Sequence, residues 1–287
     1  MATSFEHVHG PGGLSLLRLV NGDALAELCP ERGALVTRLC AGDDELLYLD
    51  EETLADRARN VRGGIPVLFP MAGKLPGDAY ADGGRTYALT QHGFARNRAF
   101  EVTARELDAS SVRATCRLAA DPATLAAYPW PFELTLTFTL QAARLLIDAT
   151  LANHGDRPMP HALGYHPYFR VDAAHKGDVR VETDATLAFD NRAGAVVPWA
   201  APDFTQGELD LHLVNHTLPG TVLSRRPLRP VRLEWDEAFT TLVLWTLPGR
   251  PFVCAEPWTA PTGALAKSEA RLVGPGTSET LRFAIGW

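Results

Sequence analysis

Short runs in which apolar and polar residues alternate recur along the whole chain. The clearest run covers residues 133–140, in which every second residue is apolar and threonines stand between them. Because successive side chains of a strand point to opposite sides, this alternation predicts a strand with one face buried against a core. The buried residues of this strand are expected to be Leu134, Leu136, Phe138 and Leu140.

Similar runs predict strands through the rest of the chain, whereas no stretch keeps an apolar period of 3.6 residues for a dozen residues. Residues 53–59 and 121–127 are expected to form single helical turns at most, the second with Asp121 as its cap and Pro122 at its first position. The predicted strands are 14–20, 24–28, 34–40, 45–49, 100–105, 111–118, 133–140, 144–153, 179–183, 186–189, 231–235, 240–246, 252–256 and 280–285.

More than a dozen short strands without the spacing of strand–helix–strand units predict an all-β fold, a large antiparallel β-sandwich. The 24 glycines and 21 prolines favour the many turns that such a fold needs. No internal repeat or clear linker is visible, so we expect one domain over residues 1–287. A boundary near residues 200–207 remains an alternative.

The charge of the chain is mildly acidic, with 27 Lys and Arg against 34 Asp and Glu, and the basic residues form no long run. We therefore expect neither nucleic acid nor a membrane surface as a partner. The first residues lack a basic segment followed by an apolar one, and nowhere do 18 apolar residues come together, which predicts a cytoplasmic protein.

The cysteines are scattered, with no Cys-x-x-Cys pair, so we expect reduced, buried thiols and neither a zinc site nor a disulfide framework. The chain also lacks a Gly-x-Ser-x-Gly elbow, a phosphate-binding loop, a dinucleotide fingerprint and a His-Glu-x-x-His motif. Nucleotide-dependent chemistry and zinc hydrolysis therefore lose support. The four cysteines are Cys29, Cys40, Cys116 and Cys254.

The strongest candidate for chemistry is Glu256, which follows an apolar run that predicts a short strand. Pro257 is expected to end this strand, so Glu256 would be its last buried residue, with Trp258 close by. Poor solvation there would raise the pKa of the carboxyl toward the range of a general base. The alternative is a glutamate at an exposed edge. Cys254 is a weaker candidate as a nucleophile, because no helix N-terminus or cation is apparent that would lower its pKa.

Three of the nine histidines have unusual neighbours: His92, His161 and His166. His166 precedes a proline and two aromatic residues, a composition suited to a wall on which the C–H face of a sugar can stack. Each histidine taken singly is more often structural, but together with Glu256 they outline an acid/base site. The remaining histidines lie in polar or turn-like contexts where the sequence reveals no partner, namely His7, His9, His154, His175, His212 and His216.

Four segments in order resemble those of the aldose 1-epimerase, or galactose mutarotase-like, family: RGGIPVLFP at 62–70, QHGFAR at 91–96, GYHPYF at 164–169 and EPWT at 256–259. The resemblance spans nearly the whole chain. It implies a galactose mutarotase-like supersandwich and an epimerase that acts at the anomeric carbon of a sugar with no metal and no cofactor.

The resemblance also implies roles for single residues. Glu256 resembles the catalytic base, His166 the catalytic acid, and His92 a sugar-binding residue near the ring oxygen. Lys74 stands where relatives usually have an arginine that binds substrate, which keeps the charge but loses the bidentate fork. Trp258, in the last of the four segments, is a further expected sugar contact. Relatives also bind the sugar with a carboxylate from the second half of the chain, for which Asp210 is the candidate, with Asp190 and Asp203 as alternatives.

The predicted substrate is a free aldohexose whose α and β anomers are interconverted, and the expected assembly is a monomer or a homodimer. Arg62 and Arg96 lie in segments that also resemble those of hexose-6-phosphate epimerases. With Lys74 they could form a cationic pocket for a phosphate, unless they pair with carboxylates or backbone carbonyls. A sugar-binding protein without activity and a glycoside hydrolase, which needs two carboxylates about the scissile bond, are further alternatives.

Overall fold

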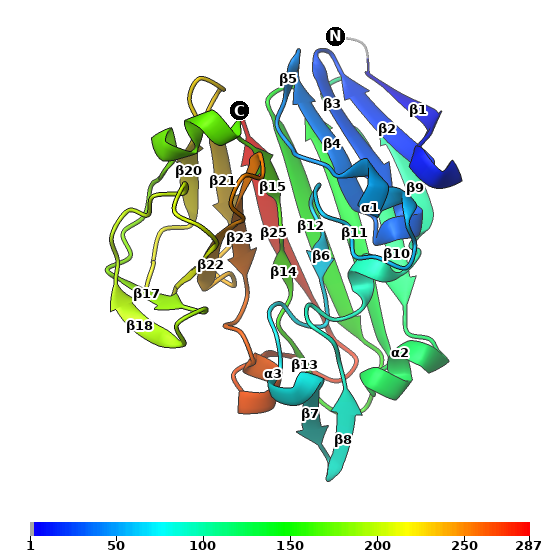
Figure 1. Ribbon diagram of the computed structural model, residues 1–287. Helices are drawn as coiled ribbons and strands as arrows, with labels where there is room; N and C mark the ends of the chain where they lie inside the picture. The colour runs from blue at the N-terminus through cyan, green and yellow to red at the C-terminus, as the bar shows by residue number, and fades with distance from the viewer. Residues whose placement is uncertain (1–2) are drawn as a thin grey trace.

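Two layers of antiparallel strands face each other across one large hydrophobic core in the computed structural model, which describes residues 3–287 (Figure 1). The first layer is a single eight-stranded sheet. In spatial order its strands are β16 (Arg180–Val181), β20 (Gly220–Ser224), β21 (Val231–Trp235), β25 (Ser278–Gly286), β12 (Arg144–Asn153), β11 (Phe132–Gln141), β10 (Val112–Ala119) and β9 (Glu101–Leu107).

The opposite layer consists of two sheets that are joined by isolated bridges between Val36 and Ile65 and between Leu47 and Phe169. The smaller sheet contains β1 (Thr3–His9), β2 (Ser15–Asn21), β3 (Ala24–Cys29), β4 (Leu35–Ala41) and β5 (Asp44–Glu45). The larger sheet contains β18 (Ala195–Pro198), β17 (Leu187–Asp190), β19 (Leu209–Leu213), β22 (Thr241–Thr246), β23 (Phe252–Trp258), β14 (Gly164–Tyr165) and β6 (Val67–Leu68), with β15 (Tyr168–Arg170) paired to β23.

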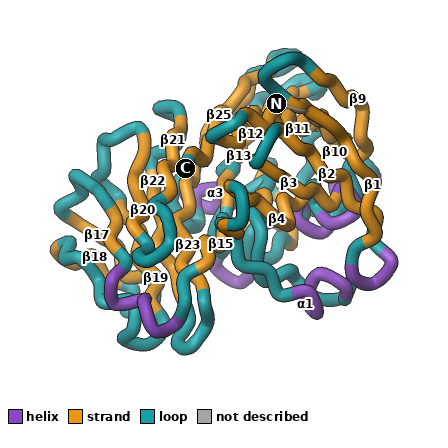
Figure 2. The backbone as a smooth tube through the Cα atoms, turned by 90° about the horizontal axis from the view of Figure 1, so that it is seen from above, coloured by secondary structure: helices purple, strands orange, loops and turns teal. Residues whose placement is uncertain are grey.

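Viewed from above, β17–β23 lie to one side of the molecule and β1–β4 with β9–β12 lie to the other (Figure 2). The smaller sheet packs on β10 and β11, whereas the larger sheet packs on β25. At this second contact Tyr165 stacks on Phe283 with ring centroids 4.9 Å apart. The side chains of both layers therefore contribute to one continuous core.

The alternation in residues 133–140 explains the middle of the first sheet. Leu134, Leu136, Phe138 and Leu140 are fully buried, and the threonines at 135 and 137 lie on the opposite face and are partly exposed. Strand β11 is paired over its whole length with β12, which shows the same alternation. The predicted all-β class and antiparallel sandwich are confirmed.

The remaining elements are short. The helical turn predicted at Asp121 is α2 (Pro122–Ala127), with Asp121 as its cap, whereas α1 (Glu51–Ala55) begins before the predicted 53–59 because Asp50 accepts a hydrogen bond from Thr53 N. The others are α3 (Ala264–Lys267), the 3-10 turns η1 (Pro11–Gly13), η2 (Pro30–Arg32), η3 (Pro76–Asp78), η4 (Ala95–Asn97) and η5 (Ala173–Asp178), and the strand pairs β7 (Ala79–Asp82) with β8 (Arg85–Ala88) and β13 (Met159–His161) with β24 (Arg271–Val273).

Most of the predicted strands are present, the one at 179–183 only as β16 (Arg180–Val181), and two further predictions need correction. The prediction that Pro257 ends its strand is wrong, because β23 continues to Trp258 and Pro257 lies opposite Leu242 of β22. A proline removes one N–H donor but keeps its carbonyl, so the neighbouring residues hold the pairing. The strand predicted at 45–49 is limited to its first residue, because beyond Glu45 only isolated bridges at Leu47 and Leu49 remain.

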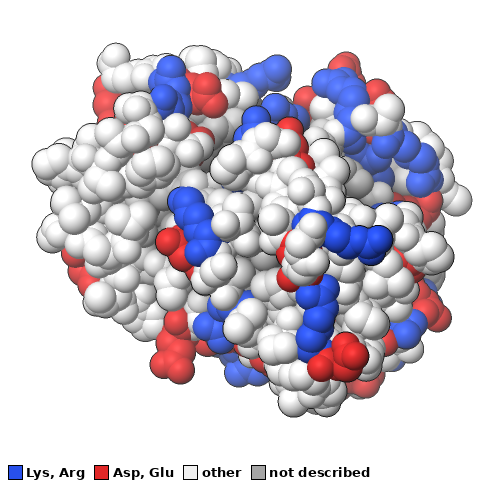
Figure 3. Space-filling view, turned by 90° about the horizontal axis from the view of Figure 1, so that it is seen from below, with Lys and Arg blue, Asp and Glu red and all other residues white. Residues whose placement is uncertain are grey.

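All four cysteines are buried free thiols, as predicted. No helix within residues 3–287 is long and apolar enough to span a membrane. On the face seen from below, basic and acidic side chains lie in small groups among uncharged ones (Figure 3).

Candidate active site

A polar pocket of about 280 Å³ lies on the larger sheet of the second layer, on the side away from the core. Strand β23 separates the two environments, because Val253 and Ala255 point into the core whereas Glu256 and Trp258 line the pocket. The volume is close to the lower end of the range for small-molecule sites, about 300–1,000 Å³. The pocket therefore fits one small ligand.

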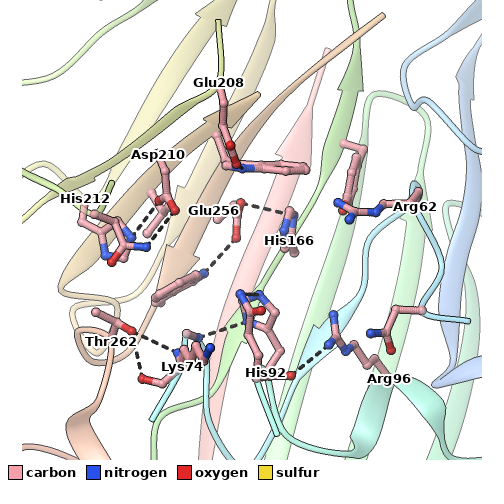
Figure 4. Close-up of a pocket in the computed structure, with 18 of the residues that line it drawn as sticks. Arg62, Lys74, His92, Arg96, His166, Glu208, Asp210, His212, Glu256 and Thr262 are labelled. Carbon is pink, nitrogen blue, oxygen red and sulfur yellow. Dashed lines mark hydrogen bonds and ion pairs between the residues drawn. The ribbon is translucent and has the colours of Figure 1, made fainter. Parts of the chain in front are cut away.

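Eight of the residues predicted for the site line this pocket: Arg62, Lys74, His92, Arg96, His166, Asp210, Glu256 and Trp258. Figure 4 shows His166 and Glu256 pointing toward each other near its centre, with Arg62 and Arg96 on one side and Asp210 and His212 on the other.

Glu256 is buried, with 1% of its surface exposed, so the alternative of an exposed edge glutamate is wrong. Its Oε2 atom accepts a hydrogen bond from Nε1 of Trp258 at 3.2 Å. Burial raises the pKa of the Glu256 carboxyl well above its ordinary value, and the charge of Asp210 raises it further. The strand thus holds a carboxyl group in poorly solvated surroundings beside the pocket.

His166 follows β14 and faces Glu256. Its backbone N–H donates to the carbonyl of Pro66 at 3.0 Å, and its ring stacks on Tyr168 with centroids 4.6 Å apart. These contacts fix the ring so that Nδ1 lies 3.2 Å from Oε1 of Glu256, although the angle does not make a hydrogen bond. Burial and the charge of Arg96 lower the pKa of His166 to about 3.

The pKa of Glu256 is raised and the pKa of His166 is lowered, and two facing groups with such opposite shifts can share one proton. Burial disfavours both charged forms: it raises the pKa of Glu256 and lowers the pKa of His166, which favours the proton on Glu256 over the proton on His166. Transfer of this proton to His166 gives a carboxylate and an imidazolium with the same total charge. A base and an acid can therefore arise together at this position without a proton from solvent.

His92 is held in an unusual backbone conformation, with a φ of 66°. Its Nδ1 atom accepts a hydrogen bond from Gly73 N at 3.0 Å, so the ring proton is on Nε2. Burial lowers the pKa of His92 well below its ordinary value, and the ring is therefore a neutral donor. The next residue, Gly93, also has a positive φ, and a Cβ atom added to it would lie 2.3 Å from the carbonyl oxygen of Phe69. Only glycine lets these two segments approach so closely.

Asp210 on β19 receives hydrogen bonds from two neighbours. Nε2 of His212 lies 3.0 Å from Oδ1, and Nδ2 of Asn191 donates to Oδ2 at 2.8 Å. Burial acts to raise the pKa of Asp210, but these hydrogen bonds outweigh it and keep the pKa below its ordinary value. Asp210 is thus an ionised acceptor at the pocket wall.

The alternatives to Asp210 are not in the pocket. Asp190 accepts hydrogen bonds from the backbone of Arg192 and Ala193, and Asp203 does the same for Thr205. Both carboxylates stabilise turns, which is a common use of aspartate.

His161, one of the three histidines singled out in the sequence, lies outside the pocket and contacts Glu279 through Nε2. Glu279 also accepts a hydrogen bond from Arg271. These contacts indicate a structural role for His161.

Three cationic residues line the pocket. Arg62 has its guanidinium 5.6 Å from the centre of the Trp245 ring, and Arg96 donates to the carbonyl of Gln91 at 2.8 Å. Among residues 3–287, neither arginine forms an ion pair, and Nε of Arg96 is buried without a hydrogen-bond partner. Burial lowers the pKa of Arg96 to about 10. Lys74 is exposed, with its backbone N–H bound to Thr262.

Sequence reasoning missed several pocket residues. His212 was assigned to a polar context without a partner, which is wrong: it lies on β19, is 2% exposed and contacts Asp210 and Trp258. The alternation in residues 209–213 could have predicted this strand. Other missed residues come from loops or from strand positions without a distinctive pattern, namely Asn60, Gln91, Asn191, Glu208, Trp245 and Thr262.

Comparison with known proteins identifies related sequences and folds. Residues 15–280 match the model of a family described as aldose 1-epimerase. The crystal structure of the Slr1438 protein from Synechocystis sp. PCC 6803 is 32% identical, with a TM-score of 0.90 over 100% of this chain and 96% of that one. A galactose mutarotase-like protein from Clostridium acetobutylicum, 16% identical, shares the fold with a TM-score of 0.84 over 99% of this chain and 98% of that one.

A curated relative, the putative glucose-6-phosphate 1-epimerase of Escherichia coli K12, is 30% identical over 131 residues. The match covers 46% of this chain and 40% of the relative. The galactose mutarotase-like architecture expected from the sequence is thus confirmed by its structural relatives.

Proposed function

The chain belongs to the aldose 1-epimerase family, and we propose that it interconverts the α and β anomers of an aldohexose by opening and closing the sugar ring. The observation that carries this proposal is the buried pair of Glu256 and His166, whose facing atoms are 3.2 Å apart beside a pocket of monosaccharide size. Anomer exchange needs one group that takes a proton and one that gives a proton.

The proposed reaction begins from the form of the pair in which Glu256 is ionised and His166 is protonated. Glu256 removes the proton from the hydroxyl on C1 while His166 donates its proton to the ring oxygen O5. The C1–O5 bond breaks and C1 becomes an aldehyde. Rotation about C1–C2 and closure with the roles reversed give the other anomer, and both protons return to their starting groups.

Each positioned acid or base contributes about 10² to 10⁴ in rate. The opening of a hemiacetal already proceeds in water, so this contribution suffices, and each proton transfer in the scheme is made by a side chain of the pocket.

The other pocket residues are assigned to binding. The neutral His92 donates from Nε2 to a sugar oxygen, the ionised Asp210 accepts from sugar hydroxyls, and Trp258 supplies an apolar surface. The group that faces Glu256 is an imidazole and not a second carboxylate, which favours epimerisation over glycoside hydrolysis.

The free hexose remains the substrate proposed from the sequence, and one observation favours a second candidate, a hexose 6-phosphate. Arg62 and Arg96 line the same pocket, and within the described part of the chain no carboxylate pairs with either of them. Arginines are well suited to a phosphate, and a buried Nε without a partner is a donor that such a ligand could satisfy. The contact that argues against a hexose 6-phosphate is the hydrogen bond that Arg96 already donates to the carbonyl of Gln91.

Polarimetry on freshly dissolved α-glucose and α-glucose 6-phosphate tests both candidates. The protein is expected to accelerate the approach to the equilibrium rotation over buffer alone. If the protein accelerates anomer exchange of neither sugar but calorimetry still detects binding, a sugar-binding protein without activity is favoured. Release of reducing ends from a chromogenic glycoside would favour a hydrolase.

Arg96→Ala separates the two substrates. If the free hexose is the substrate, this variant changes catalytic efficiency for glucose by less than about threefold, and added salt has little effect. A preference for the phosphorylated sugar that falls steeply with salt and disappears in Arg96→Ala would instead establish the second candidate.

A further inference from the structure

Cys254 is a buried thiol that the proposed reaction does not use. It is fully buried on β23, two residues before Glu256, and is not among the residues that line the pocket. Residues two apart on a strand share a face, so Cys254 lies beneath the catalytic pair. Its partner in the adjacent strand β15 is Tyr168, the residue on which His166 stacks.

His166, Cys254 and Glu256 each offer one ligand atom, a ring nitrogen, Sγ and a carboxylate oxygen, and these three atoms all lie within 4.8 Å of one another. Nδ1 of His166 lies 3.2 Å from Oε1 of Glu256. Bond lengths of about 2.0–2.3 Å and a tetrahedral arrangement place the ligand atoms of a zinc ion about 3.3–3.7 Å apart. Nδ1 of His166 and Oε1 of Glu256 are thus already at the spacing of ligands, and the 4.8 Å limit leaves the thiol at most about 1 Å beyond that spacing.

Two atoms of this cluster are available to a ligand. Nδ1 of His166 is buried and has no hydrogen-bond partner among residues 3–287, although it faces Oε1 of Glu256. Trp258 occupies only Oε2 of Glu256, so Oε1 remains available. His166 and Glu256 line the pocket, which provides a path from solvent.

We propose that His166, Cys254 and Glu256 form a binding site for a thiophilic divalent cation of the Zn²⁺ type, and that the bound ion blocks the enzyme. Imidazole and thiolate ligands select Zn²⁺ over Mg²⁺ and Ca²⁺, which prefer oxygen atoms. The sequence predicted no zinc site, because His166 is distant in the chain from Cys254 and Glu256 and the three residues form none of the usual zinc motifs.

The charges balance when the ion enters. The empty cluster carries one proton on Cys254 and one shared by His166 and Glu256. One Zn²⁺ displaces both protons to solvent, forms bonds to sulfur, nitrogen and oxygen, and leaves the net charge unchanged. The nearby charges of Arg62 and Arg96 therefore oppose binding only weakly. Three protein ligands would leave the fourth position of a tetrahedral ion for water.

Co²⁺ tests the site directly, because a thiolate ligand to Co²⁺ gives a charge-transfer absorption in the near ultraviolet. The wild-type protein is expected to show this band and Cys254→Ser to lack it. Absence of the band in the wild-type protein would overturn the proposal, so the test holds even if the variant does not fold.

Inhibition tests the consequence, which rests on the proposed epimerase function. Zn²⁺ is expected to abolish the acceleration of anomer exchange, EDTA to restore it, and Mg²⁺ to have no effect. In Cys254→Ser the Zn²⁺ concentration for half inhibition should rise at least about tenfold, since even the loss of groups behind the ligands costs about 10–100-fold in metal affinity. A chain that shows the Co²⁺ band but no epimerase activity would support the site and contradict the function.

Two controls exclude other metal-binding groups. Cys40 is a second thiol near a carboxylate, 3.2 Å from Oε2 of Glu45, so Cys40→Ser should leave the response to both metals unchanged. His7 and His9 are exposed on one face of β1 and could chelate a metal weakly. Loss of the inhibition in a variant with both changed to alanine, or an unchanged half-inhibitory concentration in Cys254→Ser, would overturn the proposal.

Discussion

At the scale of single residues, position decides which of several similar side chains takes part in chemistry. His92 and His166 are both buried, and their ring centroids are 5.6 Å apart. Only His166 faces a carboxylate, whereas Nδ1 of His92 is occupied by the backbone of Gly73. The ring of His166 can therefore exchange a proton with Glu256, whereas the ring of His92 can only donate a hydrogen bond.

This difference predicts unequal effects of the same substitution. His166→Asn should lower kcat by about 10² or more, because the acid acts only in the transition state, whereas His92→Asn should act mainly on KM. Steady-state polarimetry over a range of sugar concentrations measures both constants. A larger loss of kcat in His92→Asn would mean that the two roles are exchanged.

At the scale of elements, alternation predicted the strands well where one face is buried along the whole length. Strands β11 and β12 are such cases. The strand predicted at 252–256 is present as β23, but its predicted end is wrong. All seven residues of β23 are buried, because one face meets the core and the other the pocket. A strand buried on both faces carries no alternation, so the pattern of residues does not show that β23 continues through Pro257.

The core role of β11 predicts a stability change. Leu136→Ala removes a fully buried side chain and should lower the free energy of unfolding by about 2–5 kcal/mol. Thr135→Ala is the matched control, since Thr135 lies on the opposite face and partly exposed, and it should change stability by less than about 1 kcal/mol. Urea denaturation compares the two. Equal losses would contradict the assignment of the buried face.

At the scale of the whole molecule, the site exists because the fold brings distant segments together. His92 follows β8, His166 follows β14, Asp210 lies on β19 and Glu256 lies on β23. The sequence identified His92, His166 and Glu256 through short segments that resemble a known family, which is why the proposed catalytic pair could be predicted, whereas Asp210 lies in none of these segments. It could not reveal contacts that depend on the packing of strands with ordinary patterns, such as His212 on Asp210 or Cys254 beneath Glu256.

The whole arrangement of two layers, pocket and buried pair is proposed to serve one purpose, which is to place a base of raised pKa beside the anomeric carbon. Glu256→Gln tests this most directly, because the amide keeps the shape of the side chain and loses its basicity. The exposed Glu237→Gln is the control for a change of charge alone. The rate of anomer exchange by polarimetry should fall by about 10² or more in Glu256→Gln while calorimetry still detects sugar binding. Retention of more than about a tenth of the wild-type rate would contradict the assignment of Glu256 as the base.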